Sequence, residues 1–174
     1  MISRKKLKTI SSSDIVASSQ QSTYYDAIAD SYNELHGNEQ KKKLHLILPF
    51  LDSDSILDVG CGTGVASLPA AVGIDPSKNL LQKNTTNKKK YCGVAEDLPF
   101  PNQSFDIILC LTGIHHCNLK QALAEFRRVA RKKIIISVLK RITQHKKIVQ
   151  TIRKELNIIK EIDEEKDVIL VCAV

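Results

Sequence analysis

The chain has 174 residues, of which 43% are hydrophobic, so it is long enough to bury one core and short enough to form one domain. No apolar run approaches the roughly 18 residues of a transmembrane helix, and no apolar segment follows the basic N-terminus, so we expect neither a membrane span nor a signal peptide. The five cysteines form no CxxC pair, which argues against a zinc knuckle or a disulfide framework and favours buried, reduced thiols in a cytoplasmic protein.

The net charge of +7 is unevenly distributed along the sequence. Residues 127–160 contain twelve Lys and Arg and a single acid, Glu155, whereas residues 161–167 contain five acids and one lysine. A basic segment of this kind can face an anionic partner such as RNA, or it can be the solvated face of the last helices. The composition leaves both interpretations open.

The N-terminal part predicts a tail followed by two helices. Residues 1–21 are basic and then rich in serine, which is typical of a mobile tail, and residues 22–174 are predicted to form the single domain. Thr23 and Asp26 have the spacing of a capping box, and a short helix is predicted to follow, with Ile28, Tyr32 and Leu35 on one face. A second helix is predicted to begin after Asn38, with an apolar stripe made of Leu44, Ile47, Leu48 and Leu51.

The rest of the chain alternates between apolar runs and amphipathic segments. Strands are predicted at residues 56–59, 72–75, 91–95, 105–111, 133–138, 157–162 and 168–174. Helices are predicted at residues 76–82, 119–129 and 148–156, and segment 65–71 can form only a short helix because Pro69 interrupts it. This alternation predicts a mainly parallel α/β sheet. Its last two strands are predicted to be antiparallel neighbours, because only a short polar turn joins them.

Glycines directly follow the first predicted strand. Gly60, Gly62 and Gly64 permit a tight turn and let a ligand approach the backbone, and the buried carboxylate of Asp58 needs a partner, for which a ligand cation is one candidate. The spacing is G-x-G-x-G rather than the G-x-G-x-x-G of dinucleotide sites, and no P-loop lysine accompanies it. Asp75 ends the next strand and suits ribose hydroxyls. The pattern favours a ligand with ribose and adenine but no pyrophosphate, and it disfavours an NAD-dependent oxidoreductase.

The sequence around these residues resembles the class I S-adenosylmethionine-dependent methyltransferases. Residues 58–64 (DVGCGTG) resemble motif I of that family, and residues 73–77 (GIDPS) resemble its acidic second motif. Residues 95–100 and 104–106 look like the adenine-side region, and residues 114–116 and 122–131 are similar to later segments. The resemblance covers about residues 22–174. It implies a three-layer Rossmann-like sandwich, with a mainly parallel seven-stranded sheet and an antiparallel last strand.

The resemblance also implies S-adenosylmethionine as the methyl donor and a role for each matching residue. Asp58 and the glycine loop, which includes Cys61, would hold the methionine end, and Asp75 would accept hydrogen bonds from the ribose hydroxyls. The other residues implied to surround the cofactor are Ile74, Pro76, Ala95 and Glu96 around the adenine, Cys110 and Leu111 along the methionine arm, and Tyr32 or Tyr24 as a cover.

The chain departs from the family pattern at three places. Val94 stands where the family often has an Asp that reaches the adenine amino group. The stretch between Gly64 and Asp75 is short, which implies a clipped first helix. Arg131, Lys132 and Lys133 replace the usual Gly-Gly turn before the fifth strand.

His115 and His116 follow the fourth predicted strand, near the expected position of the methyl group. Either could be the general base that an acceptor carrying a proton requires, or it could be a histidine that only packs or hydrogen-bonds. With Cys117 they could suggest a metal site, but no fourth ligand is evident, so no metal is expected.

The motifs leave the acceptor open. Several segments resemble the quinone C-methyltransferase-like group, which favours a small molecule, and similar segments resemble wobble-uridine tRNA methyltransferases, which would use the basic surface of residues 127–160. A non-catalytic cofactor-fold subunit is a third interpretation. Only the N-terminal helices (residues 22–51) and the His115–His116 loop can cover the site. We therefore expect an open site, suited to a large substrate or completed by a partner protein or a second copy in a homodimer.

Overall fold

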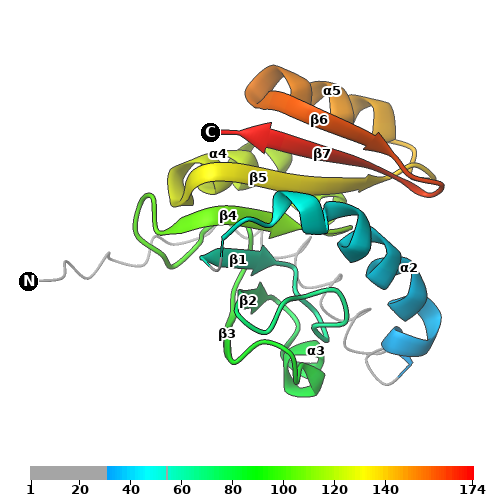
Figure 1. The fold of residues 1–174 in the computed structure, drawn as a ribbon, viewed down its shortest axis with the longest axis vertical. Helices are drawn as coiled ribbons and strands as arrows, with labels where there is room; N and C mark the ends of the chain where they lie inside the picture. Colours follow the sequence, from blue (N-terminus) through cyan, green and yellow to red (C-terminus); the bar gives the residue numbers. More distant parts are fainter. Residues whose placement is uncertain (1–30, 54) are drawn as a thin grey trace, which may run out of the picture.

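Seven strands form one sheet in the order β3-β2-β1-β4-β5-β7-β6 in the computed structural model, which describes residues 31–53 and 55–174 (Figure 1). The strands are β1 (Ile56–Val59), β2 (Val72–Asp75), β3 (Lys89–Cys92), β4 (Phe105–Cys110), β5 (Ala130–Leu139), β6 (Asn157–Asp163) and β7 (Asp167–Ala173). Strands β1 to β5 are mutually parallel, and β7 runs antiparallel to both β5 and β6. The predicted mainly parallel, seven-stranded Rossmann-like sheet is confirmed.

The helices of the described chain are α2 (Tyr32–Ile47), α3 (Lys78–Lys83), α4 (Leu119–Val129) and α5 (His145–Glu155), with single turns η1 (Leu48–Phe50) and η2 (Ile114–His116). Ser77 and Asn118 cap α3 and α4, because their side chains accept hydrogen bonds from the amides of Leu80 and Gln121. None of the described helices is long and apolar enough to cross a bilayer.

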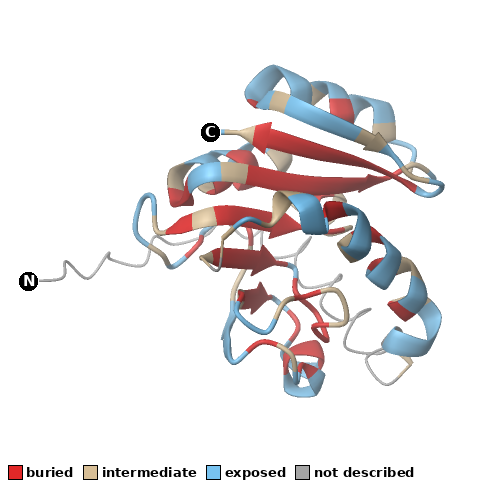
Figure 2. Cartoon of the chain, viewed as in Figure 1, coloured by how far each residue is buried: buried red, intermediate tan, exposed pale blue. Residues whose placement is uncertain are grey.

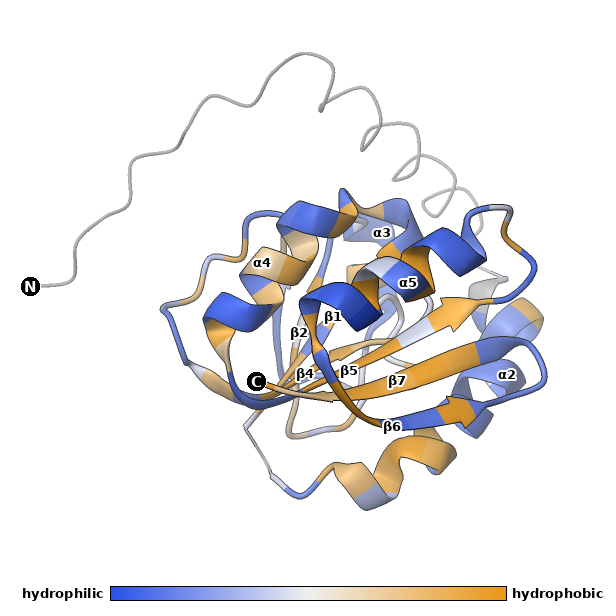
Figure 3. Cartoon of the chain, turned by 90° about the horizontal axis from the view of Figure 1, so that it is seen from above, coloured by the Kyte–Doolittle hydropathy of each residue, from blue (hydrophilic) through white to orange (hydrophobic). Residues whose placement is uncertain are grey.

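Two apolar clusters cover the two faces of the sheet. Successive strand residues point to opposite faces, so Ile108 packs toward α4 and α5 while Ile107 and Leu109 pack toward the end of α2 and η1. Figure 2 shows the central strands buried along nearly their whole length, as expected of strands with both faces covered. Figure 3 shows α4 and α5 together on one face. The result is a three-layer sandwich.

The N-terminal helix differs from its prediction. One continuous helix, α2, runs through Gly37 and Asn38, where a boundary between two helices was predicted. Its buried residues are Gly37, Gln40, Lys43 and Ile47, whereas Leu35 and Leu48 are 62% and 45% exposed. The predicted stripe holds at Leu44, Ile47 and Leu51, which pack in the apolar cluster near the end of α2, and fails at Leu48. Farther toward the N-terminus the buried face of α2 is polar, with Gln40 and Lys43. Residues 1–30, which include the predicted tail and Tyr24, lie outside the described residues.

Other elements also differ from their predicted bounds, including β3, which covers Lys89–Cys92 rather than residues 91–95, and α5, which begins at His145 rather than at residue 148. Residues 65–71 form turns rather than a short helix. Strand β5 begins at Ala130, three residues before its predicted start, and so includes Arg131 and Lys132. Both side chains form ion pairs with Asp106 on the neighbouring strand β4, at 2.7 and 2.8 Å, and these contacts extend the strand through charged residues.

Phe126 provides a test of the packing between α4 and the sheet. The Phe126→Ala variant is expected to lower the free energy of unfolding by about 3–5 kcal/mol, since a fully buried aromatic ring leaves a cavity. Urea unfolding measures this value. The control is Ile159→Ala on the edge strand β6, where the side chain is 52% exposed and the change should stay within about 0.5 kcal/mol. Equal effects of the two substitutions would contradict the assigned core.

Candidate functional site

A pocket opens at the carboxyl ends of β1, β2 and β4, where open parallel sheets bind their ligands. Four segments line it: the end of β1 with its glycine turn, the β2–α3 connection, the segment after β3, and the segment from the end of β4 through η2. The lining residues are Val59, Gly60, Gly62, Asp75, Pro76, Ser77, Leu80, Gly93, Val94, Ala95, Glu96, Cys110, Leu111, Thr112, Gly113, His116 and Cys117.

The glycine turn after β1 requires glycine for two reasons. Gly60, Gly62 and Gly64 have φ values of +77°, +50° and +77°, a region that other residues rarely adopt. A Cβ on Gly64 would also lie 2.5 Å from Oδ1 of Asn84. The Gly60 amide donates to the carbonyl of Ile74 at 2.8 Å, which ties the turn to β2. Gly60 and Gly62 therefore present backbone to the pocket, while Gly64 packs behind it.

Asp75 is held rigidly at the end of β2. Its Oδ2 accepts a hydrogen bond from the Gly62 amide and its Oδ1 accepts one from the Ser77 amide, both at 2.8 Å. A carboxylate offers about four acceptor positions, so two amides can fix its orientation while it accepts further hydrogen bonds. This side chain is 6% exposed and lines the pocket, as expected for an acid that recognises a diol.

Asp58 lies behind the pocket wall rather than in it. Burial raises the pKa of its carboxyl to about 7, repulsion by Asp75 acts in the same direction, and a hydrogen bond with Ser67 opposes the rise. Two carboxyl groups are thus buried at adjacent strand ends. The repulsion between them disfavours the charged form of Asp58.

Three other predicted residues support the turn without lining the pocket. Cys61 and Ile74 are buried, and burial raises the pKa of the Cys61 thiol far above its usual value, so it stays protonated. Gly64 packs against Asn84, whose Nδ2 donates to the Gly62 carbonyl at 3.1 Å. Sequence analysis assigned no role to Asn84, because a side chain that braces a distant loop leaves no local pattern.

Most of the remaining residues predicted to contact the cofactor line the pocket. Pro76, Ala95, Cys110 and Leu111 line the pocket. Glu96 also lines it, and its Oε1 accepts a hydrogen bond from the Asn118 amide at 2.6 Å, just before α4. Val94 lines the pocket where the family often has an acid. The side chain of Tyr32 lies outside what the structure describes.

The structure separates the two histidines. His116 lines the pocket, whereas His115 is not among the lining residues. The two imidazole rings are in contact, with centroids 3.9 Å apart and planes tilted by 42°. Burial lowers the pKa of both imidazoles, that of His115 to about 4, helped by the nearby charges of His116, Lys43 and Arg141. Both rings are therefore neutral at pH 7, the form that can accept a proton. Nδ1 of His115 finds no hydrogen-bond partner among the described residues.

The basic segment, residues 127–160, carries less unpaired positive charge than its composition suggests. Six of its twelve cationic side chains form ion pairs: Arg128 with Glu125, Arg131 and Lys132 with Asp106, Lys133 with Asp52, Lys140 with Asp163, and Arg153 with Glu161. Residues 131–133 begin β5, and β5 runs parallel to β4. They therefore lie at the end of the sheet opposite to the pocket.

The buried carboxyl of Asp58 generates a prediction on stability. In the folded protein its pKa is about 7, against an ordinary value of 3.8, so the folded state binds the proton more tightly and loses stability as pH rises through 7. Asp58→Asn is expected to raise the Tm at pH 8 by roughly 5 °C or more. Near pH 4 the variant and the wild type should melt at similar temperatures. Scanning fluorimetry across this range measures the difference.

Asp106→Asn is the matched control, because it should respond with the opposite sign. Hydrogen bonds from Lys132, Ser53 and Arg131 lower the pKa of Asp106 to about 2. Its stabilising effect is present above its ordinary pKa and is lost as pH falls toward 2. The substitution should therefore lower the Tm at neutral pH. A rise in Tm for both variants at pH 8 would contradict the distinct environments of the two acids.

Comparison with known proteins identifies the family of this fold and pocket. Residues 57–138 match the family model described as a methyltransferase domain. The uncharacterized protein MJ1252 of Methanocaldococcus jannaschii is 42% identical over 114 residues, which cover 61% of this chain and 45% of that protein. Demethylmenaquinone methyltransferase of Tropheryma whipplei is 39% identical over 90 residues, or 44% of this chain and 37% of that enzyme. The matched part spans less than half of each relative.

A SAM-dependent methyltransferase of Thermotoga maritima superposes on this chain with a TM-score of 0.71 at 17% identity, covering 86% of this chain and 97% of that one. At this identity the similarity shows a shared fold. The family match extends from β1 through most of β5 and contains every residue that lines the pocket. Residues 57–138 thus match a methyltransferase domain, and the chain has the fold of S-adenosylmethionine-dependent methyltransferases.

Proposed function

We propose that this protein binds S-adenosylmethionine in the pocket and transfers its methyl group by in-line displacement to a small-molecule acceptor. The observation that carries the proposal is the fixed Asp75 carboxylate beside Gly60 and Gly62, which line the pocket. This arrangement suits a ligand with a ribose diol and a cationic amino acid end.

The residues of the chain have distinct tasks in this proposal. Asp75 binds and orients the ribose, and the glycine turn lets the ligand approach the protein backbone closely. When bound, S-adenosylmethionine supplies a methyl group that its sulfonium has already activated. The apolar walls at Leu111 and Cys110 exclude water, and the protein gains rate mainly by alignment.

His116 is the residue proposed to accept the proton of the acceptor. It lines the end of the pocket formed after β4, and its imidazole is neutral at pH 7. A neutral imidazole within reach of the acceptor can remove a proton as the new bond forms. His115 contacts His116 from behind and would orient it.

The chemistry of the pocket favours a neutral or anionic acceptor. The two acids that line it, Asp75 and Glu96, come from the β2–α3 connection and the segment after β3. The end formed by Thr112, Gly113 and His116 contributes no carboxylate to the lining. A cationic amine would have no counter-charge there. The similarity to demethylmenaquinone methyltransferase agrees with a small uncharged or acidic acceptor.

A tRNA acceptor is the second candidate, and the basic residues 127–160 favour it. Half of these charges are neutralised by neighbouring acids, and those of residues 131–133 lie at the opposite end of the sheet. Binding of tRNA that falls steeply with salt would support this acceptor. Binding that is weak and insensitive to salt would exclude it.

Asp75 provides the first test of cofactor binding. Asp75→Ala is expected to weaken S-adenosylmethionine binding by about 1.5–3 kcal/mol, the usual value of a hydrogen bond to a charged group. Titration calorimetry measures the affinity. Asp97→Ala is the control, since Asp97 is an exposed acid close in sequence to the pocket wall but not part of it. Absence of heat with the wild type would favour a non-catalytic subunit instead.

A second test uses methyl-labelled S-adenosylmethionine with a fractionated extract of the source organism. Label is expected in the small-molecule fraction, and His116→Gln should slow its incorporation by about 10²-fold or more, the usual contribution of a general base. His45→Gln, an exposed position on α2, is the control. Labelling of RNA would replace the proposed acceptor, and an undiminished rate for His116→Gln would remove the base.

A further inference from the structure

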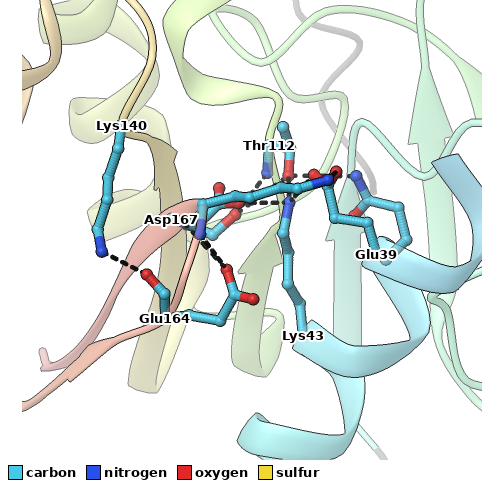
Figure 4. A network of polar contacts seen from close by, with 9 residues as sticks. Glu39, Lys43, Thr112, Lys140, Glu164 and Asp167 are labelled. Atoms are coloured by element: carbon cyan, nitrogen blue, oxygen red, sulfur yellow. Dashed lines mark hydrogen bonds and ion pairs between the residues drawn. The ribbon is translucent and has the colours of Figure 1, made fainter.

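Helix α2 carries a lysine that is completely buried. Nζ of Lys43 lies 2.9 Å from Oε1 of Glu39, 2.7 Å from Oδ2 of Asp167 and 2.7 Å from Oγ1 of Thr112 (Figure 4). These three oxygens match the three donors of an ammonium group. The side chains of Lys43 and Asp167 are both 0% exposed. Lys43 thus joins α2 to the first residue of β7 and to the turn after β4.

The buried ion pair is not explained by its contribution to the stability of the fold. Removing two charges from water is expensive, so a buried pair is often no more stabilising than apolar residues of the same size. Lys43 lies between Gln40 and Ile47 on the buried face of α2, where an apolar side chain could have packed. Its position therefore suggests a role that apolar packing could not perform.

Thr112, which Lys43 contacts, has a strained backbone, and holding it is a role that a polar partner can perform. Thr112 has a φ of +61°, and a β-branched residue rarely adopts this left-handed conformation. Such strain persists only where the surroundings over-determine it, and it concentrates at functional sites. Here the Thr112 amide donates to Oγ of buried Ser137 at 2.8 Å, and Oγ1 accepts hydrogen bonds from Lys43 at 2.7 Å and Gln40 at 3.3 Å.

The turn at Thr112 leads directly to the proposed base. Thr112 and Gly113 both line the pocket, and the amide of His116 donates to the Gly113 carbonyl at 3.0 Å, closing η2. Ile114, between them, is fully buried and anchors η2 to the core. The direction in which the chain leaves β4 therefore sets where η2 presents His116.

We propose that Lys43 is a positioning residue, which holds Thr112 in its left-handed conformation from helix α2 and so places His116 at the acceptor end of the pocket. The inference rests on the proposed function for its purpose, but the geometry of the turn can be tested without any acceptor. It also assigns α2 a part in the site, as the element that fixes the turn after β4.

Two variants test whether Lys43 positions Thr112 or only stabilises the fold. Lys43→Met with Asp167→Asn removes both charges of the fully buried pair together, which avoids leaving either one unpaired. Thr112→Val removes only the hydroxyl and keeps the shape of the side chain. Thr112→Ser restores the hydroxyl and is the rescue variant. Arg153→Met with Glu161→Gln removes a pair of similar length, 2.8 Å, between α5 and β6, and is the matched control.

The main measurements are hydrogen exchange of the segment 111–117 and the imidazole titration of His116 by NMR. In the Lys43/Asp167 variant and in Thr112→Val, amide exchange at Thr112 should be about tenfold faster, the order expected for one lost hydrogen bond. The His116 pKa should return toward its ordinary value as the ring becomes less buried. Thr112→Ser and the Arg153/Glu161 control should behave as the wild type.

The outcomes distinguish this inference from the proposed function. If the Lys43/Asp167 variant fails to fold, Thr112→Val carries the test alone. Unchanged exchange and unchanged His116 titration in a folded variant would overturn the positioning role. Affinity for S-adenosylmethionine, measured by calorimetry, should stay within about twofold in the Lys43/Asp167 variant, because neither substituted residue lines the pocket. No such expectation applies to Thr112→Val, because Thr112 lines the pocket. A wild type that does not bind the cofactor would refute the proposed function and leave the positioning result intact.

Discussion

The hydrogen bond from the Gly62 amide to the Asp75 carboxylate is the contact on which the site depends. It joins the turn after β1 to the end of β2, and it forms because Gly62 has a left-handed backbone that aims its amide at the neighbouring strand. Without Asp75, the Gly62 amide would lose its hydrogen-bond acceptor on β2. Without glycine, the amide could not take that direction. One contact therefore fixes both the shape of the turn and the orientation of the acid.

The same arrangement carries an electrostatic cost. Asp58 and Asp75 are both buried at adjacent strand ends, and the pKa of Asp58 is raised because its charged form is poorly solvated and repelled. A fold selected for stability alone would avoid this pair. A site for a ligand with a positive group retains it, because the ligand supplies the missing charge. Stability and binding thus oppose each other at this edge of the sheet.

Helix α2 extends the site beyond the strand ends that the motifs identify. Its buried face is polar in the middle, with Gln40 and Lys43, and apolar only toward Ile47. The polar part reaches Thr112 at the end of β4, while the apolar part packs on the sheet. The helix therefore connects the core of the sandwich to the turn that carries His116. In the proposed reaction it would contribute to alignment through that turn.

The sequence by itself determined the succession of strands and helices along the chain, the glycine turn and Asp75. Through the resemblance to a known family, it also led to Pro76, Ala95, Cys110 and Leu111 at the pocket. The strands, the glycine turn and Asp75 follow from local signals, since apolar runs, glycine spacing and strand ends are encoded in neighbouring residues. The roles of the other four residues were implied by the resemblance. Only the tertiary structure decided that Asp58 lies behind the wall, that His116 rather than His115 reaches the pocket, and that Lys43 supports Thr112. Those facts depend on contacts between residues about 70 positions apart, such as Lys43 and Thr112, whose sequence separation is 69. Periodicity along the chain cannot reveal a buried lysine, because at that position an apolar residue would satisfy the same helical pattern.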